Sequence, residues 1–149
     1  MILLVIDTQK LIMTNNLYNF DSLVPNIEQL IATARKNKIE IVYIRHDDGP
    51  NTELTEGKEG FDIYKKFQPT THERIFDKTV NSAFKGTGLL EYLKEKGTKK
   101  IVVAGLQTNF CSNSTSFKYA RVSSVPYCGA TLVAVISDGI CSKSVTSSR

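Results

Sequence analysis

Short apolar runs joined by helix-like segments are the feature that most constrains the fold of this chain. Residues 1–6 (MILLVI) form a continuous run of β-favouring residues without alternation, which is the pattern of a strand buried on both faces. Further strands are predicted at Ile39–Ile44, Arg74–Phe76, Lys100–Ala104 and Thr131–Ile136. Strands that are separated by helices form a parallel sheet with right-handed crossovers.

Apolar residues at helical spacing fill the segments between these strands. They recur along residues 22–38, where Asp21 or Ser22 is the expected helix cap. The sequence therefore predicts an α/β, three-layer, Rossmann-like fold, with helices on both faces of a mostly parallel sheet, in a single domain over residues 1–149. Two more helices are predicted, one through Leu89, Leu90 and Leu93 that stops at Gly97 and one from Cys111 to Ala120, while residues 49–72 form an irregular lid or pocket wall.

The composition of the 149-residue chain is ordinary for a soluble globular domain, with 41% hydrophobic and 23% charged residues. The net charge of +4 comes from Lys and Arg scattered among acidic residues, which argues against nucleic-acid binding. The longest apolar runs are too short to span a bilayer, and no basic segment precedes the first run as in a signal peptide. Three cysteines without a CxxC spacing favour a reducing compartment, so we expect a cytoplasmic protein.

Asp7, Lys78 and Cys111 each lie where an apolar run gives way to polar residues. The carboxyl ends of parallel strands meet at one edge of the sheet, where α/β proteins bind ligands, so these side chains are expected to converge. An acid, an amine and a thiol together support thiolate attack on a carbonyl, because the amine lowers the pKa of the thiol and the acid moves the proton. The three residues therefore indicate a cysteine hydrolase.

Each of these residues also has an interpretation in which it plays no catalytic part. Cys111 has the position of a buried thiol that only packs, Lys78 that of a surface lysine and Asp7 that of a helix or loop cap. However, Cys111 precedes a predicted helix, whose backbone N–H groups and positive dipole end favour a thiolate and an oxyanion. Cys128 and Cys141 have no neighbouring base or cation, so no catalytic role is expected for them.

His46 opens the segment HDDGP, which at first suggests a set of metal ligands. The only other histidine is His72, and no ligand spacing links the two, so neither a metal nor another cofactor is expected. His46 is instead predicted to line the substrate pocket or to hydrogen-bond within its loop. Gln9, Phe84 and Phe110 are further candidates for contact with substrate, and packing is the alternative for each.

Four segments, in order along the chain, resemble the isochorismatase-like cysteine hydrolase superfamily, which includes nicotinamidases and related amidases. They are LLVIDTQ near the start, HDDGP at 46–50, KTVNSAFKGTGL from Lys78 and VVAGLQTNFCSNST at 102–115. The last segment is the most specific of the four. The resemblance extends from Met1 to about Ala120, with similar gaps between the segments.

The resemblance implies a catalytic triad of Asp7, Lys78 and Cys111. In this triad Cys111 attacks the substrate and forms a thioester, Asp7 handles the proton, and Lys78 holds the ion pairs together. The resemblance also implies an oxyanion hole made by the backbone N–H groups of Gln107 and Cys111. A cis peptide between Leu106 and Gln107 would shape that oxyanion hole.

The resemblance narrows the expected chemistry. Nicotinamidases also hold a metal through an Asp and several His beside the pocket, and this sequence has no such set. The expected activity is therefore hydrolysis of a small amide or a related C–N bond. Vinyl-ether hydrolysis of the isochorismatase type and nicotinamidase activity stay alternatives, as does a catalytically silent binding or assembly protein.

The C-terminal part departs from the pattern of the superfamily. The segment RVSSVPYCGA intervenes before the fifth predicted strand, and the chain stops at Arg149 after a Ser-rich tail. The sequence therefore predicts a shortened or altered C-terminal part, whose exposed apolar surface is expected to be covered in a homo-oligomer, a dimer or larger. The other expected partner is a small-molecule substrate, with no nucleic acid and no membrane.

Overall fold

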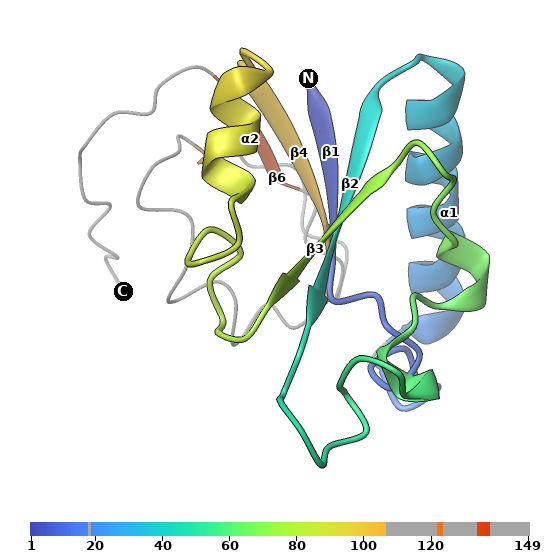
Figure 1. Cartoon of the computed structure of the whole chain (residues 1–149). Helices are drawn as coiled ribbons and strands as arrows, with labels where there is room; N and C mark the ends of the chain where they lie inside the picture. Colours follow the sequence, from blue (N-terminus) through green and yellow to red (C-terminus); the bar gives the residue numbers. More distant parts are fainter. Residues whose placement is uncertain (18, 107–121, 124–133, 138–149) are drawn as a thin grey trace, which may run out of the picture.

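The computed structural model describes residues 1–17, 19–106, 122–123 and 134–137. Its strands are β1 (Ile2–Ile6), β2 (Glu40–His46), β3 (Arg74–Lys78), β4 (Lys100–Gly105), β5 (Val122–Ser123) and β6 (Ala134–Ser137). They form a six-stranded sheet in the order β3-β2-β1-β4-β6-β5 (Figure 1). β1 pairs in parallel with β2 and β4, and β2 pairs in parallel with β3. The prediction of a mostly parallel sheet is therefore confirmed.

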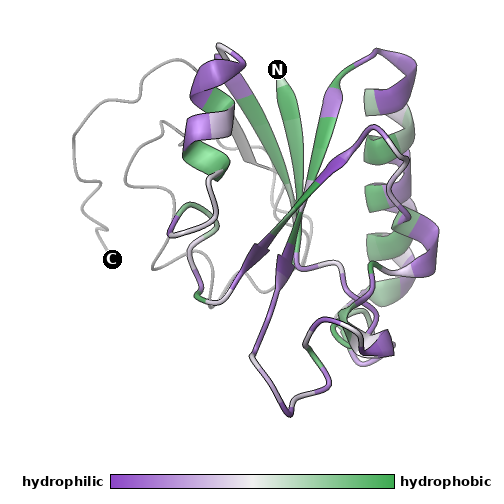
Figure 2. Ribbon diagram, viewed as in Figure 1, coloured by the Kyte–Doolittle hydropathy of each residue, from purple (hydrophilic) through white to green (hydrophobic). Residues whose placement is uncertain are grey.

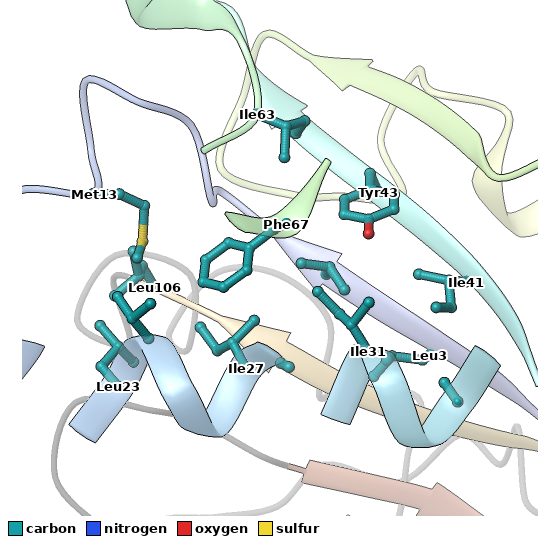
Figure 3. Close-up of a cluster of buried hydrophobic side chains, with 14 residues drawn as sticks. Leu3, Met13, Leu23, Ile27, Ile31, Ile41, Tyr43, Ile63, Phe67 and Leu106 are labelled. Atoms are coloured by element: carbon teal, nitrogen blue, oxygen red, sulfur yellow. The ribbon is translucent and has the colours of Figure 1, made fainter. Parts of the chain in front are cut away.

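Two helices lie on opposite sides of this sheet, α1 (Phe20–Lys36) and α2 (Leu89–Glu95) (Figure 1). Alternation along β1 separates two apolar layers, because Leu3 belongs to the cluster under α1 whereas Leu4 belongs to the cluster under α2. Figure 3 shows side chains of α1 packed against the strands and Phe67. The predicted three-layer α/β fold is therefore confirmed. In the described part of the chain, neither helix is long and apolar enough to cross a membrane.

The start of α1 differs from the prediction. The helix begins at Phe20 after Asn19, so Asp21 or Ser22 as the cap was wrong. Asn19 lies in the left-handed region (φ 55°), which Asn adopts more readily than most residues. Its carbonyl accepts hydrogen bonds from the N–H groups of Ser22 and Leu23. Because Phe20 packs against the apolar cluster under α1, we attribute the earlier start to burial of this ring rather than to side-chain capping.

The irregular segment 49–72 packs against the exit of β1. Phe61 is 2% exposed and Phe67 is 0% exposed, and the N–H group of Tyr64 donates to the carbonyl of Thr8 at 2.8 Å. The segment is therefore packed onto the protein at these points, and its role as a lid or a pocket wall stays a prediction. The segment contains two short 3-10 helices, η1 (Glu59–Phe61) and η2 (Lys65–Phe67).

The parallel strands run further than predicted, to His46 in β2, Lys78 in β3 and Gly105 in β4. Polar residues continue β2 and β3 because they face each other across the two strands: Arg45 lies opposite Asp77, and His46 lies opposite Lys78. Figure 2 shows that both strands are hydrophilic at these carboxyl ends and hydrophobic in their middle. Polar side chains of β2 and β3 therefore gather at the carboxyl edge of the sheet.

Gly105 is the last residue of β4, one position beyond the predicted strand at Lys100–Ala104. A Cβ at this position would lie 2.2 Å from the carbonyl oxygen of Ile6, so the close approach of the two backbones requires glycine. The next N–H group, that of Leu106, donates to the same Ile6 oxygen at 3.2 Å. The end of β4 is thus held directly against the end of β1.

Strand β6 runs in the opposite direction to β1, β2, β3 and β4. β6 pairs antiparallel with β4 and with β5, so it does not extend the parallel set. The predicted fifth strand is confirmed over residues 134–136, whereas residues 131–133 and the predicted helix from Cys111 to Ala120 lie outside the described residues.

Candidate active site

A buried ion pair joins Asp7 and Lys78 at the carboxyl edge of the sheet. Lys78 Nζ donates to Asp7 Oδ2 at 2.9 Å, and the two residues are 2% and 3% exposed, respectively. Asp7 follows β1 and Lys78 ends β3, so the side chains meet across β2, which lies between those strands. The structure thus brings together two of the three residues of the predicted triad.

Asp7 adopts a left-handed backbone conformation (φ 55°) directly after β1. This region is uncommon for residues other than glycine, and Asp is among those that adopt it most readily. The N–H group of Asp7 still donates to the carbonyl of Ile44 at 2.9 Å, so the chain leaves β1 only after this last bond to β2. Residues in such conformations are concentrated at functional sites, which agrees with a functional role for Asp7.

Alternation along β3 gives Lys78 a different environment from its neighbour Asp77. The guanidinium of Arg45 donates to both carboxylate oxygens of Asp77, at 2.7 and 2.8 Å, and lies 4.2 Å from the ring centroid of Phe61. The Asp77 side chain is 42% exposed, whereas the Lys78 side chain is 1% exposed. One strand therefore carries an ion pair in solvent and another in the interior.

Burial makes the Asp7–Lys78 pair costly to form. Each ion loses roughly several kcal/mol of hydration free energy, and mutual attraction offsets this loss only when the geometry is good. Replacement of buried ion pairs by apolar residues often leaves stability unchanged or raises it. Stability alone therefore does not account for this pair, and we treat it as a candidate catalytic group.

Gln9 lies beside this pair with its side chain fully engaged. The Nε2 atom donates to the carbonyl of His46 at 2.9 Å, and the Oε1 atom accepts from the N–H group of His46 at 2.7 Å. Gln9 is 0% exposed. Direct contact between Gln9 and a substrate stays a prediction.

His46 lies opposite Lys78 in the register of β2 and β3, so both side chains belong to the face that α2 covers. Its Nε2 atom lies 2.9 Å from Asp48 Oδ1, and its Nδ1 atom is buried without a hydrogen-bond partner among the described residues. Phe84 packs, partly buried, against the apolar cluster of the same face. Both residues are thus on the Lys78 side of the sheet, and their contact with substrate stays a prediction.

Several predicted site residues lie outside the described part of the chain. They are Cys111, Gln107 and Phe110, and with them the backbone N–H groups of the oxyanion hole and the peptide bond between Leu106 and Gln107. Leu106 is the last described residue before this segment and is 4% exposed. Its N–H group donates to the carbonyl of Ile6 at the end of β1, and convergence of Cys111 with Asp7 and Lys78 stays a prediction. Within the described ranges, no three His, Cys, Asp or Glu side chains group as metal ligands.

The sequence interpretation missed two residues that shape this edge. Asp48 hydrogen-bonds the His46 ring, and its signal was an acid two positions after a histidine at a strand exit. Gly105 permits the close contact with β1, and its signal was a glycine at the end of an apolar strand.

The fold and the buried pair define an α/β protein with a candidate catalytic edge. The chain belongs to the isochorismatase family, because residues 1–147 match the family's isochorismatase domain. This match confirms the family resemblance of the four sequence segments.

Individual relatives agree with this assignment. The uncharacterized isochorismatase family protein YrdC of Bacillus subtilis is 36% identical over 92 residues, which are 61% of this chain and 49% of YrdC. The secreted isochorismatase effector Isc1 of Verticillium dahliae is 29% identical over 104 residues, covering 69% of this chain and 55% of Isc1. A solved structure of an isochorismatase-family protein from Chromobacterium violaceum is similar with a TM-score of 0.69 and 30% identity, over 76% of this chain and 61% of that one. The chain spans about half the length of the curated relatives it matches.

Proposed function

We propose that the chain is a cysteine-dependent hydrolase of a small amide or a related C–N bond, with Cys111 as the nucleophile. Members of the isochorismatase family are hydrolases. The observation that carries the proposal is the Asp7–Lys78 pair, 2.9 Å apart and buried at the ends of two strands. A carboxylate that is fixed in place, with a cation beside it, meets the needs of a thiol that must lose and return a proton.

In the first half of the proposed reaction, the sulfur of Cys111 attacks the carbonyl carbon of the amide and its proton passes to Asp7. The carbonyl π electrons move to the oxygen, which becomes an oxyanion. When this intermediate collapses, the C–N bond breaks, and Asp7 gives the proton to the leaving nitrogen. The products of this half are a free amine and a thioester on Cys111.

In the second half, water attacks the thioester and passes a proton to Asp7. The C–S bond breaks, the thiolate of Cys111 takes the proton back, and the acid product leaves. One water molecule is consumed in the whole cycle. Lys78 keeps its ammonium beside the carboxylate throughout, where it adds positive charge near the thiolate and the oxyanion.

A hydrolysis screen with Cys111→Ala tests this proposal. The panel contains small primary amides, carbamoyl amines, cyclic imides, nicotinamide and a vinyl ether, and release of ammonia, amine or acid is measured. The unmodified protein should turn over an amide or imide, and Cys111→Ala should lower the rate by about 1,000-fold or more with an unchanged circular dichroism spectrum. Cys128→Ala is the matched control and should keep the rate.

Thiol alkylation gives a second measurement that needs no substrate. Iodoacetamide should modify Cys111 faster than Cys128 and Cys141, because the thiolate is the reactive form and a nearby cation favours it. Equal alkylation of the three thiols in the native protein, or full turnover by Cys111→Ala, would contradict the proposed function. Turnover of the vinyl ether alone would support the isochorismatase type of reaction instead.

A further inference from the structure

The side-chain carboxamide of Gln9 makes the two hydrogen bonds to β2 that the backbone of a neighbouring strand would otherwise make. The backbone pairing of β1 with β2 ends with Ile6 opposite Ile44 and the bond from Asp7 N–H to Ile44 O. β2 continues to His46, where it pairs with β3. The backbone N–H and C=O groups of His46 that face away from β3 therefore need other partners, as buried backbone groups do.

Gln9 supplies both of these partners. A carboxamide has the same donor and acceptor as a peptide group, and its two atoms lie 2.9 and 2.7 Å from the His46 backbone. Since Gln9 is 0% exposed, water does not compete for these bonds, and loss of either one would leave a buried polar group without a partner.

The bonds of Gln9 link the segment that carries Asp7 to β2, the strand that pairs with β3 beside Lys78. Gln9 follows Asp7 by two positions. On the other side of β2, His46 lies opposite Lys78, and the N–H group of Asp47 donates to the carbonyl of Lys78 at 2.8 Å. Movement of the end of β2 would therefore change the separation of the Asp7 carboxylate and the Lys78 ammonium.

We propose that Gln9 is a positioning residue of the hydrolase site, which acts through His46 to hold Lys78 at hydrogen-bond distance from Asp7. The role rests on the proposed function of the chain. It replaces direct contact between Gln9 and substrate, because both polar atoms of the side chain are already bonded to the backbone of His46.

Two substitutions of Gln9 separate its hydrogen bonds from its volume. Gln9→Met keeps a side chain of similar size and removes both bonds. Gln9→Glu keeps both bonds while the carboxyl is protonated, since a neutral acid has one donor and one acceptor, and it loses the donor on ionisation. Gln68→Met is the matched control, because Gln68 Nε2 donates to the carbonyl of Ile63 at 2.6 Å within the segment 49–72 rather than to β2.

The kinetic test separates positioning from substrate contact. For Gln9→Met we expect kcat to fall by up to about 100-fold, as for small misplacements of reacting groups, while KM changes by less than about threefold. For Gln9→Glu, the rate relative to the unmodified protein should fall as the pH rises and the carboxyl ionises. Gln68→Met should leave both kcat and KM unchanged. A raised KM at unchanged kcat in Gln9→Met would overturn the proposal, and so would unchanged values of both.

Hydrogen exchange of the His46 backbone N–H tests the same contact without any substrate. The exchange should become about tenfold faster in Gln9→Met, as expected when a local bond is lost, and should be unaffected in Gln68→Met. An unchanged exchange rate in Gln9→Met overturns the positioning role. If the unmodified protein hydrolyses nothing, the proposed function fails, and the exchange rate still decides whether Gln9 holds β2. If Gln9→Met does not fold, Gln9→Glu at low pH provides the comparison.

Discussion

Two ion pairs on neighbouring residues of β3 differ in their surroundings and so in what they contribute. Asp77 accepts two hydrogen bonds from Arg45, at 2.7 and 2.8 Å, with its side chain 42% exposed. Lys78 pairs with Asp7 at 2.9 Å with its side chain 1% exposed. Exposed pairs stabilise proteins by about 0–1 kcal/mol, whereas removal of one partner of a buried pair costs about 3–5 kcal/mol. Burial, rather than the number of hydrogen bonds, therefore distinguishes the pairs.

Strand alternation is the cause of this difference. Adjacent residues of a strand face opposite sides of the sheet, so a shift of one position would place the carboxylate of Asp77 inside and Lys78 outside. The register of β2 and β3 prevents this shift, because it sets Arg45 opposite Asp77 and His46 opposite Lys78. One backbone arrangement thus stabilises an exposed pair and fixes the candidate catalytic pair.

The largest effect on stability is expected for Lys78→Met. This change leaves the Asp7 carboxylate buried without its ammonium partner, so the free energy of unfolding should fall by about 3–5 kcal/mol. Asp7→Asn should have an effect of the same sign, because it leaves the ammonium of Lys78 buried without the carboxylate. Urea unfolding followed by circular dichroism at neutral pH measures both changes.

The double variant Asp7→Asn/Lys78→Met is the control for charge burial. Asn tolerates the left-handed backbone at position 7 (φ 55° in Asp7) and carries no charge. Because no charge stays buried, the double variant should unfold at a higher urea concentration than either single variant. Should the losses of the single variants simply add in the double variant, the two residues are not coupled, and burial does not explain the difference between the pairs.

An intermediate effect is expected at Glu73, whose side chain is 10% exposed and pairs with Arg35 at 2.8 Å. Burial raises the pKa of Glu73, but hydrogen bonds from Arg35 and Thr70 outweigh it and hold the pKa below its ordinary value of 4.5. The fold therefore favours the ionised form. The resulting stabilisation is complete above pH 4.5 and is lost as the pH falls through the lowered pKa.

Glu73→Gln tests this intermediate case. The substitution should lower the free energy of unfolding by about 1 kcal/mol at neutral pH, and the difference from the unmodified protein should shrink at about pH 3. Urea unfolding at the two pH values measures it. If the loss of unfolding free energy is the same at both pH values, packing rather than charge accounts for the contribution of Glu73 to stability.

The placement of Asp7 and Lys78 could be predicted because it depends on local sequence and a topological rule. Asp7 directly follows the apolar residues of β1, Lys78 comes two positions after Phe76 at the end of β3, and parallel strands bring their carboxyl ends to one edge. The burial of the pair was not predictable in the same way, because it depends on which strands are neighbours. No single segment of the sequence indicates that β2 lies between β1 and β3.

Two causes explain the remaining differences between prediction and structure. One is contact between residues distant in the sequence, and the other is packing that overrides a local preference. Gln9 and His46 are separated by 37 positions, and no local pattern shows that the amide replaces a strand residue. At the start of α1, Asp21 and Ser22 had the chemistry of a cap, but the helix begins at Phe20, whose partly buried ring packs against the core. Tertiary packing overrode local preference there, as it commonly does.

The smallest effect is expected for Asp77→Asn, the neighbour of Lys78 on β3. Its cost should stay within about 0–1 kcal/mol, because Arg45 keeps its contact with the Phe61 ring at 4.2 Å and solvent reaches this side chain. The difference should shrink further at about 1 M salt, which screens exposed charges, while the loss in Lys78→Met should persist. Urea unfolding at low and high salt measures both variants. A loss as large as that of Lys78→Met would mean that charge pairing itself, and not burial, sets the contribution of an ion pair on this strand.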